Sequence, residues 1–127
     1  MIIIKNKLEP NSLKNQELLQ ALRELQPLIK SKMGCCDVAV SHQSEYGNLP
    51  ISFDEKWDDS DFYISHLKSE HFKILLGAIR VLAKTSVMTI EKDSQTTKFD
   101  LKKRDSFQGI AISISDFLKN RPVKEPK

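Results

Sequence analysis

The sequence predicts an α+β domain of the ferredoxin-like kind, with the element order βαββαβ and a C-terminal extension. Apolar residues alternate along four segments, as in strands, and recur three and four residues apart along two others, as in helices. The 127 residues are enough for one hydrophobic core but not for two independent ones. We therefore expect one domain in which two helices cover one face of a sheet.

The first predicted strand covers residues 1–8 and begins with three consecutive isoleucines. Side chains two residues apart share a face of a strand, so one face carries Ile2, Ile4, Asn6 and Leu8. Asn6 is polar between apolar neighbours, and a buried amide needs hydrogen-bond partners. A substrate oxygen could provide them, but a backbone group or solvent at a sheet edge is an equal alternative.

The first predicted helix follows a turn at residues 9–12, with Ser12 as its N-cap. Its apolar stripe consists of Leu18, Leu22, Leu25 and Ile29. Pro27 lies inside this helix, and we expect it to kink the helix or to end its regular part, because proline lacks a backbone donor.

Two alternating segments, residues 35–44 and 49–57, predict an antiparallel hairpin that is joined by a turn at residues 45–48. One face of its second strand carries Ile51, Phe53, Glu55 and Trp57. His42 and Glu55 have the parity of this face, so an imidazole and a carboxylate could meet across the hairpin. A cross-strand pair on the surface is the more common arrangement.

An acidic cluster at residues 58–61 predicts the N-terminus of a second helical region. Its first part runs to about Lys68 and a second part begins near Ser69, with a bend between them. Residues 86–92 read as the fourth strand, and residues 93–105 read as a polar linker. Residues 107–118 fit either a strand or a helix, and we expect a short docked element there. The composition of residues 121–127 is that of a flexible tail. The domain boundaries are therefore 1–92 for the folded domain and 93–127 for the extension.

Composition narrows the function classes. The net charge of +3 is spread along the chain, so we expect no nucleic-acid partner, and no segment is long and apolar enough for a membrane span. The two cysteines, Cys35 and Cys36, are adjacent and poorly placed to bond to each other, which fits the reducing cytoplasm. They also make a poor zinc ligand set, and we expect no metal. The sheet face that two helices leave open would be apolar or half-apolar, which predicts a homodimer.

Three segments carry a resemblance to a known family. They are the stretch at 34–40 that begins Gly-Cys-Cys, the Phe-Asp-Glu-Lys-Trp at 53–57, and the His-Leu-Lys-Ser-Glu-His-Phe-Lys at 66–73. In this order they resemble the antibiotic biosynthesis monooxygenase domain over residues 1–92. The resemblance implies a dimeric α+β barrel with a pocket between sheet and helices. Activities in this family include cofactor-independent oxygenation of hydroxylated aromatics or quinols and haem degradation.

The haem-degrading branch of the family resembles this chain at Asn6, but it carries a Trp and a downstream His on the second helix. This chain has His66 and Leu76 at those places. Because no neighbouring residue obviously replaces the lost iron ligand, we do not expect haem chemistry. We expect no other cofactor either, because the sequence lacks the usual cofactor-binding motifs. Glycine-rich phosphate loops and nucleophile elbows are also missing from the sequence.

The candidate catalytic residues are His66, which could accept or relay a proton, and Asn6, which could anchor an oxygen. His66 follows Phe62 by four residues and Tyr63 by three, which places it toward the interior. The candidate substrate-binding residues are Trp57, Tyr63, Phe53, His71 and Phe72. Trp57 could stack on a planar substrate. A structural role is the competing interpretation for each of these side chains: a core or interface anchor for Trp57, a hydrogen-bonded histidine for His66, and capping or packing for His71.

Three functions stay open at this point. The first is a cofactor-independent monooxygenase acting on a small hydroxylated aromatic or quinol, in which the deprotonated substrate itself reduces oxygen. The second is a noncatalytic dimeric binding module of the same fold, in which residues 107–118 dock on a partner or fill the pocket. The third is a small-molecule isomerase that uses His66 for proton transfer.

Overall fold

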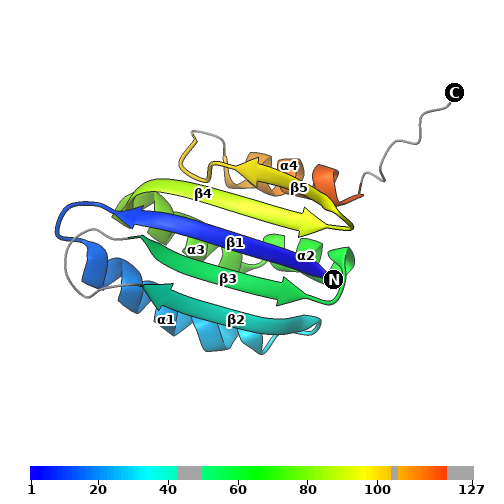
Figure 1. Cartoon of the computed structure of the whole chain (residues 1–127), viewed down its shortest axis with the longest axis horizontal. Coiled ribbons are helices and arrows are strands. Elements are labelled where there is room, and N and C mark those ends of the chain that lie inside the picture. The colour runs from blue at the N-terminus through cyan, green and yellow to red at the C-terminus, as the bar shows by residue number, and fades with distance from the viewer. Residues whose placement is uncertain (43–49, 104–105, 120–127) are drawn as a thin grey trace, which may run out of the picture.

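The computed structural model describes residues 1–42, 50–103 and 106–119 and contains a five-stranded antiparallel sheet (Figure 1). The predicted turn at 45–48 and the tail at 121–127 lie outside these residues. The elements are β1 (Ile2–Pro10), α1 (Asn15–Lys30), β2 (Cys35–His42), β3 (Ile51–Trp57), α2 (Ser60–Leu67), α3 (Glu70–Leu82), β4 (Ala83–Lys92), β5 (Gln95–Phe99) and α4 (Phe107–Lys119). The strand order β2-β3-β1-β4-β5 confirms the ferredoxin-like arrangement, to which β5 adds an edge strand.

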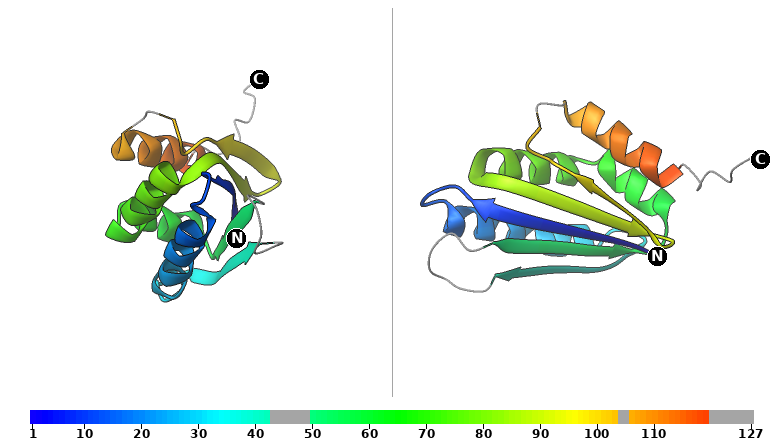
Figure 2. Two further views of the ribbon diagram at one scale, coloured as in Figure 1. Left: turned by 90° about the vertical axis from the view of Figure 1, so that its left-hand side faces the viewer. Right: turned by 45° about the horizontal axis from the view of Figure 1, so that its top comes forward.

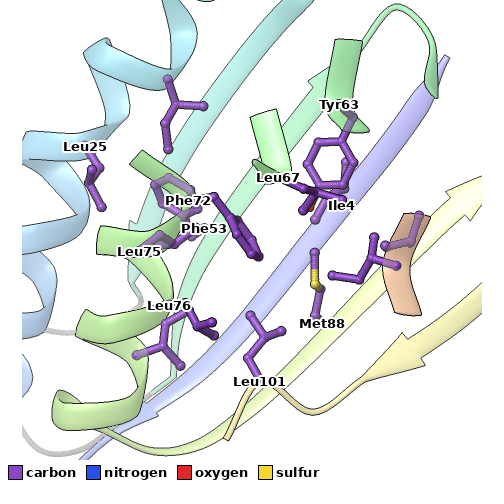
Figure 3. Close-up of a cluster of buried hydrophobic side chains, with 14 of the residues drawn as sticks. Ile4, Leu25, Phe53, Tyr63, Leu67, Phe72, Leu75, Leu76, Met88 and Leu101 are labelled. Atoms are coloured by element: carbon purple, nitrogen blue, oxygen red, sulfur yellow. The ribbon is translucent and has the colours of Figure 1, made fainter. Parts of the chain in front are cut away.

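All four helices cover one face of the sheet, and the hydrophobic core lies between the two layers (Figure 2). Every second residue of β1 and β3 is buried there, as the alternation predicted. The aliphatic stripe of α1 is buried as well. Figure 3 shows that the core side chains of α2 and α3, among them Tyr63, Leu67 and Phe72, point toward those of the sheet, such as Ile4 and Phe53.

Two helix starts follow the predicted capping chemistry. Asp59 precedes α2, and its carboxylate accepts hydrogen bonds from the backbone N–H groups of Asp61 and Phe62. Ser69 precedes α3 and accepts from the N–H of Phe72. The chain therefore bends between the two helices at the predicted position.

The start and the end of α1 differ from the prediction. Its N-cap is Lys14 and not Ser12, and no side chain caps this end. Leu13 has a φ of 64°, so the chain turns sharply just before the helix. Of the two effects expected of Pro27, an end to the regular helix is wrong: α1 continues to Lys30, and the carbonyl of Pro27 accepts a hydrogen bond from the N–H of Ser31.

Gly34 is required at the start of β2 for two reasons. Its φ of +84° lies in the left-handed region, which side-chain-bearing residues rarely adopt. A Cβ atom added at this position would lie 2.2 Å from Cγ of Phe62, the residue that follows Asp61 in α2. This glycine therefore allows α2 to approach the β2 end of the sheet closely.

The segment after β4 is more ordered than the predicted linker. Asp93 and Ser94 both have positive φ angles and form a two-residue turn, from which β5 returns along β4. The docked element at 107–118 is the helix α4, which packs beside α2 (Figure 2). Ile110, Ile114 and Leu118 are its buried residues. Among the described residues, no helix is long and apolar enough to cross a bilayer.

The open face of the sheet is more polar than expected. Lys5 and Glu91 form an exposed ion pair on it at 3.7 Å, and Asp54 and Lys98 share this face. Ile3 is half-buried and Val87 is exposed, so apolar groups are interspersed with charges. This face therefore has no continuous apolar surface among the described residues.

Candidate functional site

A group of aromatic rings surrounds His66 below helix α2. The indole of Trp57, at the end of β3, stacks on the imidazole with 5.1 Å between ring centroids and 24° between planes. Tyr63 lies one helical turn before His66 in α2 and tilts against both rings, at 5.6 Å from Trp57 and 5.8 Å from His66. The edge of Phe72, from α3, meets the imidazole at 5.8 Å. All four side chains are buried, which confirms the predicted inward orientation of His66.

Glu55 is the carboxylate of this group, and its side chain is only 1% exposed. Its Oε1 atom accepts a hydrogen bond of 2.9 Å from Nε1–H of Trp57, two residues along β3. In the sheet, Glu55 lies opposite Val38, whereas His42 lies opposite Ile51. The cross-strand pair suggested for His42 and Glu55 is therefore wrong, and the imidazole near this carboxylate belongs to His66.

His66 is held between a cation and a carboxylate. Nζ of Lys32 donates to Nδ1 of His66 at 3.1 Å and to Oγ of Ser69 at 2.7 Å. Because the lysine nitrogen is a donor, Nδ1 acts as the acceptor and the ring proton belongs on Nε2. That Nε2 atom lies 3.9 Å from Oε1 of Glu55, which is too far for a direct hydrogen bond.

Burial shifts the pKa values of Glu55 and His66 in opposite directions, and in both cases it favours the uncharged form. It raises the pKa of Glu55 to about 7, although the hydrogen bond from Trp57 and the charge of Lys32 act against this shift. Burial, together with the charges of Lys32 and His71, lowers the pKa of His66 to about 3. Burial also raises the pKa of Tyr63 well above its usual value. Near neutral pH, His66 and Tyr63 are therefore uncharged, while Glu55 is present in both its protonated and its ionised form.

Several buried polar atoms of the cluster have no hydrogen-bond partner among the described residues. They are both amide atoms of Asn6, the hydroxyl of Tyr63 and Nε2 of His66. Asn6 is 1% exposed and lies in the centre of the sheet, between Phe53 on β3 and Met88 on β4. A buried polar group without a partner costs about 1–3 kcal/mol, so such groups usually serve a ligand or ordered water.

Most of the predicted site residues thus meet in one place. Trp57, Tyr63, His66 and Phe72 are in ring contact, and Phe53 lies beside Asn6 on the neighbouring strand. His71 differs, because it is only half-buried in the first turn of α3 and makes none of these ring contacts.

Sequence reasoning missed Lys32 and Ser69 as site residues, and it considered a surface pair with His42 the more common arrangement for Glu55. The spacing of two residues from Trp57 placed Glu55 on the correct face of the strand, but it did not indicate that this carboxylate is buried. The contact of Lys32 with His66 bridges 34 positions of the chain, so no local pattern indicates it.

Helix α4 closes one side of the aromatic cluster. Phe107, in its first turn, lies 5.8 Å from the ring of Phe72, and Nζ of Lys73 lies 5.1 Å above the same Phe107 ring. Lys92, at the end of β4, donates to the carbonyl of Leu118 at 2.6 Å and ties down the other end of the helix. Two surface hollows, of about 370 and 280 Å³, lie elsewhere and include none of the cluster residues. The rings and the carboxylate of the cluster are at most 2% exposed, so a ligand contacts them only if side chains or a helix move.

The cluster is chemically suited to an organic ligand. Within the described part of the chain, no group of three or more His, Cys, Asp and Glu side chains could hold a metal ion. Neutral donors, aromatic walls and one carboxylate fit a planar molecule that bears a hydroxyl or carbonyl oxygen.

Solved structures of low sequence identity share this fold. A protein from Deinococcus radiodurans that carries the name antibiotic biosynthesis monooxygenase matches with a TM-score of 0.66 and 18% identity, over 78% of this chain and 98% of the other. A conserved protein from Methanosarcina mazei matches with a TM-score of 0.64 and 22% identity, over 72% and 90%. The protein Rv0793 from Mycobacterium tuberculosis matches with a TM-score of 0.65 and 12% identity, over 72% and 92%. None of the curated proteins matches.

The family model named antibiotic biosynthesis monooxygenase matches residues 1–75, from β1 through the first half of α3. This range contains the residues that build the cluster: Asn6, Lys32, Glu55, Trp57, Tyr63, His66, Ser69 and Phe72. By sequence and by fold, the chain belongs to the antibiotic biosynthesis monooxygenase family.

Proposed function

We propose that this protein is a monooxygenase that acts without a cofactor on a small hydroxylated aromatic or quinol. The observation that supports this most directly is the set of unpartnered buried polar atoms, on Asn6, Tyr63 and His66, among stacked aromatic rings. Such a set fits the oxygen atoms and the flat ring of this substrate class. Family membership supports oxidative chemistry, while the substrate class is inferred from the residues.

In the proposed reaction, the bound substrate loses a hydroxyl proton and then supplies the electrons that reduce oxygen. For a quinol, one atom of O₂ enters the ring and the other leaves as water, so a hydroxylated quinone is the product and no external reductant is needed. Asn6 would anchor an oxygen atom, and Trp57 and Tyr63 would flank the ring. His66 would donate a hydrogen bond from Nε2, because its Nδ1 already accepts from Lys32.

We further propose that the protein works as a homodimer through the open face of its sheet. Charged residues of both signs on this face, such as Lys5 and Glu91, could pair between two copies, and Val87 would lose its exposure. The measurement is the molar mass in solution by light scattering. A mass of one chain at micromolar concentration would contradict the dimer.

The experiment that tests the oxygenase is a thermal-shift screen with phenols, catechol, hydroquinone and dihydroxynaphthalenes, followed by oxygen-electrode assays of every compound that binds. A compound that binds only the folded state raises the melting temperature in a concentration-dependent way. We expect binding with oxygen uptake that is lost in Asn6→Ala and His66→Ala. Oxygen uptake that survives both substitutions would contradict the assigned roles.

A noncatalytic binding module is the second candidate, and the closed cluster favours it. Phe107 of α4 covers Phe72, so the helix could be the occupant of the family pocket. In that case, Phe107→Ala would weaken the packing of α4 and no tested aromatic would be consumed. An oxygenase would instead keep or increase its activity when this cover is loosened.

A further inference from the structure

The carboxylate of Glu55 is buried without an ion-pair partner in hydrogen-bond contact. Lys32 acts on it electrostatically, but the lysine nitrogen is bonded to His66 and Ser69. The direct hydrogen bond to Oε1 comes from the neutral indole of Trp57. A buried charge with so little compensation costs free energy, and such costs are typical of sites that carry out chemistry.

The other polar groups of the cluster are placed as donors. His66 presents Nε2–H at 3.9 Å from Oε1 of Glu55, and the hydroxyl of Tyr63 and the amide of Asn6 are unpartnered among the described residues. Glu55 and Asn6 point to the same face of the sheet from adjacent strands, offset by two residues. Side chains in this relation lie about 7–8 Å apart, so an oxygen-bearing group that enters the cluster when side chains move can contact both.

We propose that Glu55 is the catalytic base of this site and that it accepts the proton of the substrate hydroxyl. The O–H bond of the substrate breaks, its electron pair stays on the substrate oxygen, and the proton forms a new O–H bond with Glu55. Nε2–H of His66 and the amide of Asn6 then hydrogen-bond to the resulting oxyanion. This inference rests on the proposed function and adds to it the residue that starts the reaction.

Lys32 is the positioning residue in this arrangement. It holds Nδ1 of His66 as an acceptor, so Nε2 keeps the proton that faces Glu55. Ser69 fixes the lysine nitrogen at 2.7 Å and itself donates to the carbonyl of His66 at 2.7 Å. These contacts link the bend between α2 and α3 to the orientation of the imidazole.

The charged and titratable groups around Glu55 determine the pH dependence. Lys32, from the connection between α1 and β2, lowers the pKa of Glu55, and Asp54, on the opposite face of β3, raises it. Burial raises the pKa of Cys35 to about 11 and that of Tyr63 well above its usual value, and His66 is neutral above pH 3. Glu55 is thus a buried group of the cluster that changes charge near neutral pH, and activity should rise as the pH passes through about 7.

The test uses 2-naphthol, a hydroxylated aromatic whose phenolate absorbs at longer wavelength than its neutral form. The ligand is added to the full chain without oxygen, at pH values around the pKa of Glu55 but below that of free naphthol. In the wild type we expect the phenolate band of bound naphthol to grow as the pH rises through about 7. In Glu55→Gln we expect naphthol still to bind, as measured by thermal shift, but without this band.

Two further variants separate a chemical role from a structural one. Asp54→Asn removes the neighbouring carboxylate on the opposite face of β3; it should keep the phenolate band and move its midpoint slightly to lower pH, because Asp54 raises the pKa of Glu55. Lys32→Met removes a positive charge near Glu55 and should move the midpoint of the phenolate titration to higher pH. In oxygen-uptake assays, Glu55→Gln should lower kcat by about 100-fold or more, which is the usual contribution of a general base.

The outcomes distinguish this inference from the proposed function. A phenolate band that is absent from the wild type, or equally strong in Glu55→Gln, would overturn the role of Glu55. Oxygen uptake by wild type and Glu55→Gln alike would keep the oxygenase and remove Glu55 as its base. The expected band without oxygen uptake by any quinol or phenol would keep the base and contradict the oxygenase. Failure of naphthol and all related phenols to bind would contradict both.

Discussion

Helices α1 and α2 pack on the same face of the sheet but bury different chemistry. The buried residues of α1 are all aliphatic: Leu18, Leu22, Leu25 and Ile29. Those of α2 include Tyr63 and His66, beside the carboxylate of Glu55. Burial of aliphatic groups stabilises the fold, whereas burial of polar groups without partners costs stability. The region under α1 therefore stabilises the fold, whereas the region under α2 contains polar groups whose burial costs stability.

The largest effect is expected under α1. Leu22→Ala should lower the free energy of unfolding by about 3 kcal/mol, because it removes apolar contacts and leaves a cavity. Leu28→Ala is the matched control, since Leu28 lies on the same helix and is 48% exposed, and it should cost less than about 1 kcal/mol. Urea unfolding measures both. Equal losses would mean that the stripe of α1 is not the stabilising face.

The next effect concerns the pH dependence of stability. The raised pKa of Glu55 makes the wild type less stable as pH rises from 4.5 to about 7, because the folded chain there binds more protons than the unfolded one. The lowered pKa of His66 makes it more stable as pH rises from about 3 to 6.5, because the unfolded chain there binds more protons. Between pH 4.5 and 6.5 the two contributions oppose each other.

Glu55→Gln removes one of these two contributions. The unfolding free energy of this variant, relative to the wild type, should rise by about 1.4 kcal/mol per pH unit between pH 4.5 and 6.5. Urea titrations at three pH values within this window provide the measurement. A difference between the two proteins that does not change with pH would show that Glu55 has an ordinary pKa.

A smaller effect of opposite sign is expected at Asn6. Asn6→Leu replaces two unpartnered amide atoms by an apolar side chain of similar size, so it should raise the free energy of unfolding by about 1 kcal/mol while it abolishes activity. Thermal unfolding and the oxygen electrode measure the two properties. A loss of stability would indicate that the amide has partners in solution, such as ordered water.

The smallest effect is expected on the open face of the sheet, where side chains are exposed. Lys5→Gln breaks the pair with Glu91 and should change the stability of the isolated chain by less than about 1 kcal/mol. If the protein dimerises through this face, the same variant should raise the dissociation constant of the dimer. Sedimentation at several concentrations would show this, and an unchanged dimer would place the interface elsewhere.

Strand and helix positions were accessible from the sequence because they depend on local periodicity. The inward orientation of Trp57 and His66 follows from spacings of two, three and four residues. Strand β5 was missed because its turn, Asp93 and Ser94, lacks the glycine that usually indicates such a hairpin. The surroundings of His66 were also beyond sequence reasoning, because its contact with Lys32 depends on how α1, β2 and α2 pack together. Parity gives the face of a strand, but it does not tell that a charged residue such as Glu55 is buried.

The central position of β1 has a consequence for how the chain folds. β1 is the first strand in the chain, yet it lies between β3 and β4, and its register with β4 pairs Ile2 with Lys92. During synthesis on the ribosome, β1 therefore cannot pair with β4 until about 80 further residues have been made. Pairings so distant in sequence slow folding, because the entropy of closing the loop is lost before the contacts form. Until β4 emerges, one edge of β1 has no strand of this chain to pair with, so its backbone N–H and C=O groups stay exposed to solvent.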